Sequence, residues 1–402
     1  MTTTTMSRHR AWTGPAILSY GFRPFFLLGA IWAAGAMVLW LVWLLAWVGF
    51  VWPFSPIDWH AHALLFGYTS AAIAGFALTA VPNWTARLPI VGWPLAGLVA
   101  LWLAGRVATT WTLGLHWGVV MAIDLALPVA LVAALGREIV AGGNWRNLPV
   151  AGLIALFAAG QALFHVEAQA GGAAQGAGVR LGLAAAVMLI ALIGGRIVPS
   201  FTRNWLAARK ASTLPAPAGR ADAVVLALTG AALVLFVLAP HQAATGWLAL
   251  AAGLGNLWRL SRWQGWRTGG EPLVWVLHAA FAFIGLGFLA IAAAVLGWIT
   301  DAGARHLWLA GAVGLMTLAV MTRASLGHTG RKLTASRPIT ALYLAVILAA
   351  LARPANALWP QLPGLMELAA IGWMVGFAGF AVIYWPSLTR PRPAAKAASG
   401  RG

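Results

Sequence analysis

Apolar runs of roughly 20 residues, separated by short polar connections, recur along almost the whole chain. About 20 predominantly apolar residues are needed for a helix to cross the hydrocarbon core of a bilayer. Only 8% of the residues are charged, far below the share in soluble domains. The sequence therefore predicts an all-α integral membrane protein with about twelve transmembrane helices. The predicted spans are residues 26–50, 60–82, 93–113, 116–137, 150–168, 180–199, 222–240, 245–262, 272–298, 306–328, 338–352 and 362–386.

The positions of the basic residues orient these helices. If the N-terminus is cytoplasmic, the outward-facing connections hold only four of the 26 Lys and Arg residues: Arg106, Arg180, Arg305 and Arg353. The other 22 belong to the termini and the inward-facing connections. Because cytoplasmic loops are enriched in Lys and Arg, both termini are predicted to be cytoplasmic. The net charge of +18 thus follows membrane topology and does not indicate nucleic-acid binding.

The connections leave no room for a soluble domain. We predict a cytoplasmic N-terminal segment (1–25), a single transmembrane domain (26–386) and a basic, disordered cytoplasmic tail (387–402) that touches the lipid surface. The longest polar connection separates two halves of the transmembrane domain, roughly 26–206 and 222–386.

The chain contains no cysteine. This excludes iron–sulfur clusters, a thiolate-ligated haem, covalent c-type haem attachment and disulfides. Any redox chemistry must therefore rest on histidine and on a cofactor that is not covalently bound.

Seven of the nine histidines lie within or at the ends of predicted spans, where ionisable residues are candidates for function. His116, at the outer end of the fourth span, is assigned an interfacial role, which leaves six. Neutral imidazole is a good ligand for both haem iron and copper, so we treat all six as candidate metal ligands. For His60 and His62, which lie beside Trp59, an ordinary role at the membrane interface is an equal alternative. Four form an outer layer and two a cytoplasmic layer: His60, His62, His165 and His306, then His278 and His328.

The stretch DWHAHALLFGY (58–68) puts two histidines one residue apart. In a regular helix, residues i and i+2 point about 200° apart. Either the helix start is irregular and both rings converge, or His60 and His62 serve different centres.

Among the acids, Asp124 lies deep in the fourth predicted span. It is a candidate for a proton path, with pairing to a buried Trp or Arg as the alternative. Glu167 follows His165 by two residues and is a candidate partner of a ligating imidazole. We treat both carboxylates as candidate catalytic residues.

Arginines gather at the cytoplasmic edge beside glycine, proline or apolar residues. Guanidinium groups bind carboxylates in a bidentate way and tolerate partial burial. Haem propionates, lipid headgroups or an anionic substrate would all suit them. The candidates are Arg23, Arg196, Arg203 and Arg323.

Four separated motifs make the chain similar to a known family: YGFRPFFLL, WHAHALLFGYTSAAIAGFALTAVPNWT, GGRIVPSFTRN and HLWLAGAVGLMTLAVMTRASLGHTGR. From about residue 19 to 386 it resembles the NnrS family of bacterial inner-membrane proteins. The resemblance implies a role in the nitric oxide response and denitrification, and a content of haem and copper.

Taken with the histidines, the resemblance favours a nitric oxide reductase with a haem b and a second metal, copper or iron. A quinol or a cytochrome would supply the electrons, and apolar nitric oxide would arrive through the bilayer. A twelve-helix secondary transporter is an alternative, and it would need broken helices near Pro128 or Gly194-Gly195. A haem-based sensor or metal-delivery protein without turnover is another.

Overall fold

The computed structural model describes residues 12–46, 52–85 and 89–392. Within these ranges the chain forms helices and turns, and no strand. Parts of the predicted N-terminal segment (1–25) and of the predicted tail (387–402) lie outside the described residues. The all-helical prediction is confirmed.

The long helices follow one another through short connections. Two of them each consist of three consecutive stretches, the middle one π-helical, and short 3₁₀ helices (η1, η3, η4 and η5) lie in the connections. The long elements are α2 (Phe22–Leu44), α3 (Pro56–His62) with η2 (Ala63–Tyr68) and α4 (Thr69–Thr85), α5 (Trp93–Thr110), α6 (Trp117–Ala141), α7 (Leu148–Ala168), α8 (Ala177–Ala207), α9 (Arg220–Leu238), α10 (Ala243–Ser261), α11 (Pro272–Val295), α12 (Asp301–His306) with η6 (Leu307–Leu315) and α13 (Met316–His328), α14 (Arg337–Leu358) and α15 (Leu365–Thr389).

Each predicted span overlaps one of these helices, although the first, 26–50, runs beyond the end of α2 at Leu44 and its residues 47–50 lie outside the described part of the chain. In the described part of the chain, ten helical segments are long and apolar enough to cross a membrane. The helices α5 and α10, of 18 and 19 residues, are not among those ten. The chain is thus a multi-pass helical membrane protein, and the count of twelve spans remains a prediction.

Several helices continue through prolines at which the sequence analysis ended or interrupted them. The helix α8 was predicted to end at Pro199 but runs on to Ala207, and α14 passes Pro354 to end at Leu358. Proline removes one backbone donor, and in membranes nearby hydroxyls and packing make up for the loss. The carbonyl that Pro199 leaves without its helical donor is that of Gly195, four residues earlier.

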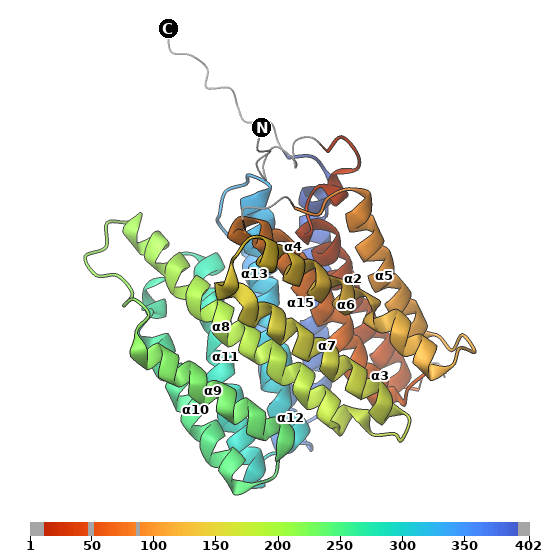
Figure 1. The fold of residues 1–402 in the computed structure, drawn as a ribbon. Coiled ribbons are helices and arrows are strands. Elements are labelled where there is room, and N and C mark those ends of the chain that lie inside the picture. The colour runs from red at the N-terminus through yellow and green to blue at the C-terminus, as the bar shows by residue number, and fades with distance from the viewer. Residues whose placement is uncertain (1–11, 47–51, 86–88, 393–402) are drawn as a thin grey trace.

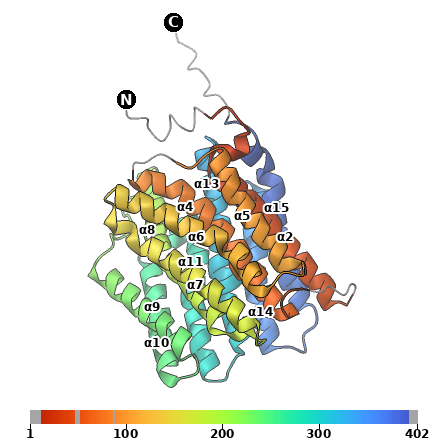
Figure 2. The same ribbon diagram turned by 45° about the vertical axis from the view of Figure 1, so that its right-hand side comes forward.

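The helices pack as one bundle. In Figures 1 and 2, α2 to α7 lie on one side and α9 to α11 on the other, with α8 between them. Helix α8 contacts α7, α9 and α11, and α2 contacts α4 and α15. The Nη1 of Arg23 donates to the carbonyls of Leu388 (3.2 Å) and Arg390 (2.8 Å), so the start of α2 lies beside the end of α15.

The opposite end of the bundle, called here the far end, is tied together by two charged side chains. Asp58, at the start of α3, accepts the backbone N–H groups of Gly172 (3.2 Å) and Ala174 (2.6 Å) in the α7–α8 connection. Arg305 of α12 donates to the carbonyl of Ala174 at 3.0 Å. The α3–α4 helix and the α12–α13 helix therefore begin close together, beside the end of α7. Their first turns carry His60, His62 and His306.

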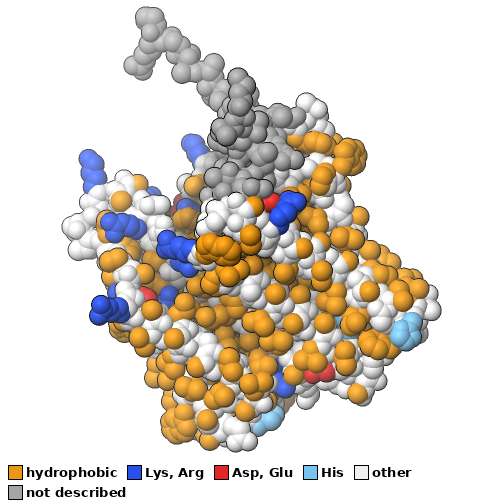
Figure 3. Space-filling model, viewed as in Figure 1, with side chains coloured by type: hydrophobic (Ala, Val, Ile, Leu, Met, Phe, Trp, Pro, Cys, Tyr) orange, Lys and Arg blue, Asp and Glu red, His pale blue; other side chains and the backbone are white. Residues whose placement is uncertain are grey.

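The surface agrees with membrane insertion. Figure 3 shows hydrophobic side chains over most of the visible face, with Lys and Arg mainly in its upper left part. Large apolar side chains are exposed on the long helices, including Trp247 at 70% and Val382 at 74%. Soluble monomeric proteins rarely expose large contiguous apolar patches.

Both π-helical stretches directly follow a histidine, and π-helices often occur at functional sites. Tryptophans bind the backbone of the first one. The indole of Trp32 donates to the carbonyl of Ala63 at 2.8 Å, and that of Trp102 to Gly67 at 3.0 Å. These bonds hold the wider turn of η2 in place.

Candidate metal centre

A cluster of buried polar side chains lies near the far end of the bundle, where α3, α5, α6 and α7 meet. Asp124 of α6 is its centre. The five side chains are each at most 3% exposed. They are Asp124, His62, Arg106, Gln161 and His165.

The carboxylate of Asp124 is surrounded by donors. Its Oδ2 lies 2.8 Å from the Nε2 of His62 and 2.8 Å from the Nε2 of His165. The side-chain amide of Gln161 donates to the same oxygen at 2.6 Å. The other oxygen, Oδ1, pairs with Arg106. Since a carboxylate only accepts, both imidazoles donate to it from Nε2 in this arrangement.

Local sequence positions these groups. Gln161 and His165 are four residues apart on α7, so they share one helix face. Glycines provide space for the ion pair: a Cβ at Gly67 would lie 2.2 Å from the Nη1 of Arg106, and one at Gly105 would lie 2.9 Å from the Oδ1 of Asp124. The close approach of α5 to η2 and to α6 requires both positions to lack a side chain.

The charges inside the cluster balance. Arg106 and Asp124 form a buried ion pair, and the guanidinium lies 5.6 Å from the ring centroid of Trp32 and 5.9 Å from that of Trp102. Burying a charge is costly unless it is paired and hydrogen-bonded. The pair therefore places a fixed carboxylate between two neutral imidazoles in a dry environment.

The donor set fits a metal ion. One ligand atom from each of His62, Asp124 and His165 lies within 4.8 Å of the others, all three residues being buried. Two imidazoles and one carboxylate are the ligands of many non-haem iron sites, and imidazole also suits copper and zinc. Arg106 and Gln161 would then hold the ligating carboxylate in position, as outer-shell partners commonly do.

His60 and His62 point to different neighbours, which is the second of the two alternatives that the helical spacing left open. The ring of His60 stacks on Trp40 at 4.4 Å between centroids. Its Nδ1 is buried without a hydrogen-bond partner in the described structure. His306, at the end of α12, is within electrostatic range of His60 and bonds through Nδ1 to the carbonyl of Ala302 at 2.6 Å. That bond leaves the Nε2 of His306 available to a ligand.

The two histidines of the predicted cytoplasmic layer have separate surroundings. The Nε2 of His278 lies 2.7 Å from the Oγ1 of Thr202 in α8. The ring of His328 lies 6.0 Å from that of Tyr20 and 5.5 Å from that of Phe22. The contacts of these two histidines do not join them into one site.

The remaining candidates lie outside the cluster. Both carboxylate oxygens of Glu167 accept backbone N–H groups at the start of α8, 2.8 Å from Ala177 and 3.0 Å from Gly178. This is an N-terminal helix cap and favours a structural role.

The four arginines of the predicted cytoplasmic edge differ in their burial. Arg23 is buried against the end of α15, and the half-buried Arg323 lies 4.0 Å from the ring centroid of Phe201. Arg196 and Arg203 are exposed on α8. Only the two exposed residues are freely accessible to a charged group outside the bundle.

Sequence reasoning missed two members of the cluster. Arg106 was assigned to an outer connection, although it lies inside an apolar run and is buried in α5. Gln161 was not considered. The sequence did hold a signal for Arg106. It and Asp124 lie in consecutive apolar runs, where each would need a buried counter-charge, so the two could have been predicted to pair.

Fold and cluster together define a multi-pass helical membrane protein with a buried two-histidine, one-carboxylate site. The family described as NnrS protein matches residues 16–392. The chain therefore belongs to the NnrS family, as its motifs predicted. A comparison with curated proteins finds no match.

Proposed function

We propose that this protein binds and consumes nitric oxide at a metal held by His62, Asp124 and His165. The reaction takes two NO, two electrons and two protons to N₂O and water. The observation that supports it is the convergence of two imidazole nitrogens and one carboxylate oxygen within 4.8 Å, in a buried site of an NnrS-family protein. We place the protein in the bacterial inner membrane, with twelve spans and both termini cytoplasmic.

The metal is copper or a second iron, and when bound it supplies Lewis-acid and redox chemistry. The protein's own residues supply the rest. Arg106 and Gln161 orient the carboxylate of Asp124, and apolar rings exclude water. Phe54 and Phe164 lie 5.2 Å and 5.0 Å from the ring of His62. A dry site strengthens every charge interaction within it.

The haem b that the family leads us to expect is assigned to His306 or His60. A ligating histidine usually donates its second ring N–H to a carbonyl, which fixes the tautomer. The bond from His306 to Ala302 has this form. Electrons would come from a quinol or a cytochrome.

A transporter is less well supported. It would need interrupted helices near Pro128 or the Gly194-Gly195 pair, but α6 and α8 run unbroken through those positions. A sensor without turnover shares the same ligands, so only a product assay separates it from a reductase.

The test uses the full-length protein purified in detergent. Metal and haem contents are measured, optical spectra are recorded after reduction and after addition of NO, and N₂O is assayed by gas chromatography. His62→Ala should lose the non-haem metal and N₂O formation. The exposed His241 provides a matched control, and His241→Ala should keep both.

Three outcomes are informative. Metal, an NO-dependent spectral change and N₂O would support the reductase. Metal and a spectral change without N₂O would support the sensor. Protein that binds no metal after anaerobic reconstitution with iron or copper would refute the proposal.

A further inference from the structure

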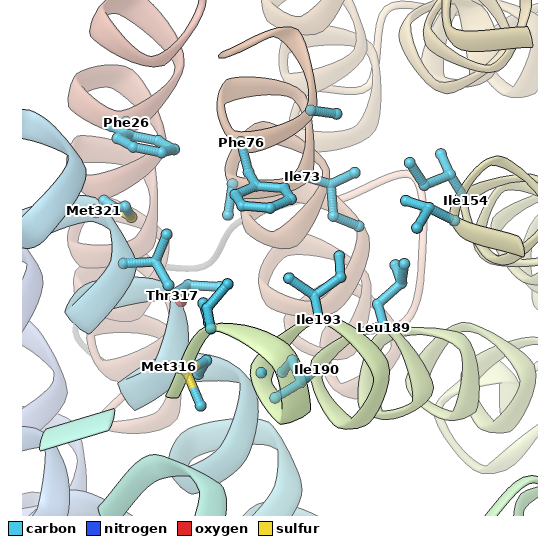
Figure 4. Close-up of a pocket in the computed structure, with 16 residues that line it drawn as sticks. Phe26, Ile73, Phe76, Ile154, Leu189, Ile190, Ile193, Met316, Thr317 and Met321 are labelled. Atoms are coloured by element: carbon cyan, nitrogen blue, oxygen red, sulfur yellow. The ribbon is translucent and has the colours of Figure 1, made fainter. Parts of the chain in front are cut away.

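An apolar cavity of about 90 Å³ lies in the bundle between α2, α4, α7, α8 and the η6–α13 helix. Figure 4 shows Ile73, Ile154, Leu189 and Ile193 on one side of it, and Phe26, Met316, Thr317 and Met321 on the other. The lining is almost wholly hydrocarbon and thioether. No charged side chain of the described residues lines it.

The hydroxyls at its edge do not make it polar. The Oγ1 of Thr317 lies 2.6 Å from the hydroxyl of Tyr68 and donates to the carbonyl of Val313 at 2.7 Å. Hydroxyls that bond to each other and to the backbone offer little to water. The cavity is partly open, and its apolar lining favours apolar atoms and molecules over water.

The cavity and the metal-binding cluster lie along the same helices. On the α3–α4 helix, His62 belongs to the cluster and Ile73 to the cavity. On α7, His165 belongs to the cluster and Ile154 to the cavity. Both pairs are eleven residues apart, which corresponds to about 16 Å along a helix. The helix α3 starts at the far end and α7 ends there. Ile73 and Ile154 are therefore displaced from His62 and His165 in the same direction, away from the far end.

Three phenylalanine rings stand between the cavity and the cluster. The ring of Phe66 lies 5.3 Å from that of Phe157 and 5.7 Å from that of Phe164. On the cluster side, the ring of His62 lies 5.6 Å from Phe66 and 5.0 Å from Phe164. All three phenylalanines are fully buried. Phe157 is one helical turn from Ile154, on the side toward the cluster.

The fit of Phe66 against α8 is tight. A Cβ at Gly182 would lie 2.5 Å from the Cε1 of Phe66. Gly182 is seven residues before Leu189, so both lie on the same face of α8. Three of the helices that line the cavity, α3–α4, α7 and α8, therefore also enclose the rings.

We propose that this cavity binds small uncharged molecules, nitric oxide being the one relevant here, and that Phe66, Phe157 and Phe164 form a constriction between it and the cluster. An apolar diatomic molecule dissolves in the bilayer core, enters the cavity and reaches His62 and His165 when the rings move. Water and ions meet no polar partner along this path. The assignment of nitric oxide rests on the proposed function, whereas the cavity and constriction do not.

Xenon is the probe that tests the path, because it is apolar, monatomic and visible by anomalous diffraction. Crystals of the full-length, metal-free protein are pressurised with xenon. The wild type should show a peak between Ile73, Ile154, Leu189 and Ile193. Ile154→Phe should reduce its occupancy several-fold, while the control Ile371→Phe, at a lipid-facing position that is 52% exposed, should leave it unchanged.

Phe157→Ala tests the constriction. It should add a second xenon peak between the cavity and His62, where the removed ring lay. A wild type without xenon in the cavity, or a Phe157→Ala variant with no added peak, would overturn the proposal. Because no metal is needed, these results are independent of whether the cluster binds one.

Discussion

Two clusters in this protein each join a buried aspartate to arginines, and their surroundings differ. Asp222, at the start of α9, accepts Arg259 at 3.3 Å, Arg262 at 2.8 Å and the backbone N–H of Gly219 at 2.9 Å. Asp124 has one arginine, two imidazoles and an amide. The first acid is held by fixed cations and backbone, the second largely by neutral side chains.

This difference separates a structural ion pair from a site that can bind metal. The two arginines at Asp222 exceed its charge, so a metal cation there would meet net repulsion. At Asp124 a single arginine balances the carboxylate, and the imidazoles can exchange a bond to Asp124 for a bond to a metal. Both arginines depend on glycines for space: a Cβ at Gly195 would lie 2.5 Å from the Nη2 of Arg259, and one at Gly67 would lie 2.2 Å from Arg106.

Removing each acid should give the largest contrast. Asp124→Asn leaves Arg106 buried without a counter-charge, and a broken buried pair costs about 3–5 kcal/mol. Asp222→Asn should cost less, about 1–3 kcal/mol: the buried Arg259 also loses its counter-charge, but Arg262 is partly exposed and solvent screens its pair. Thermal unfolding of the detergent-solubilised variants measures both. Equal falls in Tm would show that the two acids play the same role.

Histidine removal should affect metal binding and leave the second cluster unaffected. His62→Ala or His165→Ala removes a ligand and should weaken metal binding by at least about 100-fold, since even outer-shell changes cost about 10–100-fold. Arg262→Gln serves as the matched change at the other cluster and should leave the metal affinity unaltered. A competition titration with Co²⁺ measures each. The distinction fails if Arg262→Gln weakens binding as much.

Alanine substitutions at Gly67 and Gly195 test how rigidly Arg106 and Arg259 are held. Gly67→Ala should destabilise by about 1–3 kcal/mol, the cost of overpacking, because Asp124 and the π-helix hold Arg106 in place. Gly195→Ala should cost less, since the ion pair of Arg259 with Asp222 adjoins the partly exposed Arg262 and has more room to adjust. Gly35→Ala, with open space around its Cβ, is the control. A larger loss of stability in Gly195→Ala than in Gly67→Ala would show that Arg259 is held more rigidly than Arg106, contrary to this account.

The smallest effect is expected from the tryptophan that holds η2. Trp102→Phe removes the donor to the carbonyl of Gly67, which should cost about 1 kcal/mol and loosen Arg106. Trp247→Phe, at a position 70% exposed, controls for loss of an indole. If the unfolding temperature falls equally in Trp102→Phe and Trp247→Phe, the bond from Trp102 to Gly67 does not stabilise η2.

The helices were predictable because the apolar runs match the bilayer thickness, a requirement that each helix satisfies alone. Helix ends were less predictable. Proline at 199 stops an isolated helix, yet packing against neighbouring helices carries α8 through this position to Ala207. The π-helical turns left no clear sequence signal, and the first of them, η2, is held by donors from α2 and α5.

The site was predicted in pieces. Helical geometry left two arrangements of His60 and His62 open, and the structure gives them different neighbours. The meeting of His62, Asp124 and His165 depends on the packing of three helices, which one sequence does not specify. Arg106 was misplaced because a charge near a helix end looks the same whether it faces solvent or a buried acid.

The central claim is that Asp124 and the two histidines bind one metal. X-ray absorption at the metal edge of the reconstituted protein tests it most directly. The account predicts scattering from two imidazoles and a carboxylate oxygen, with one imidazole lost in His165→Ala and no change in His60→Ala. A first shell without imidazole, or one altered equally by both variants, would contradict it.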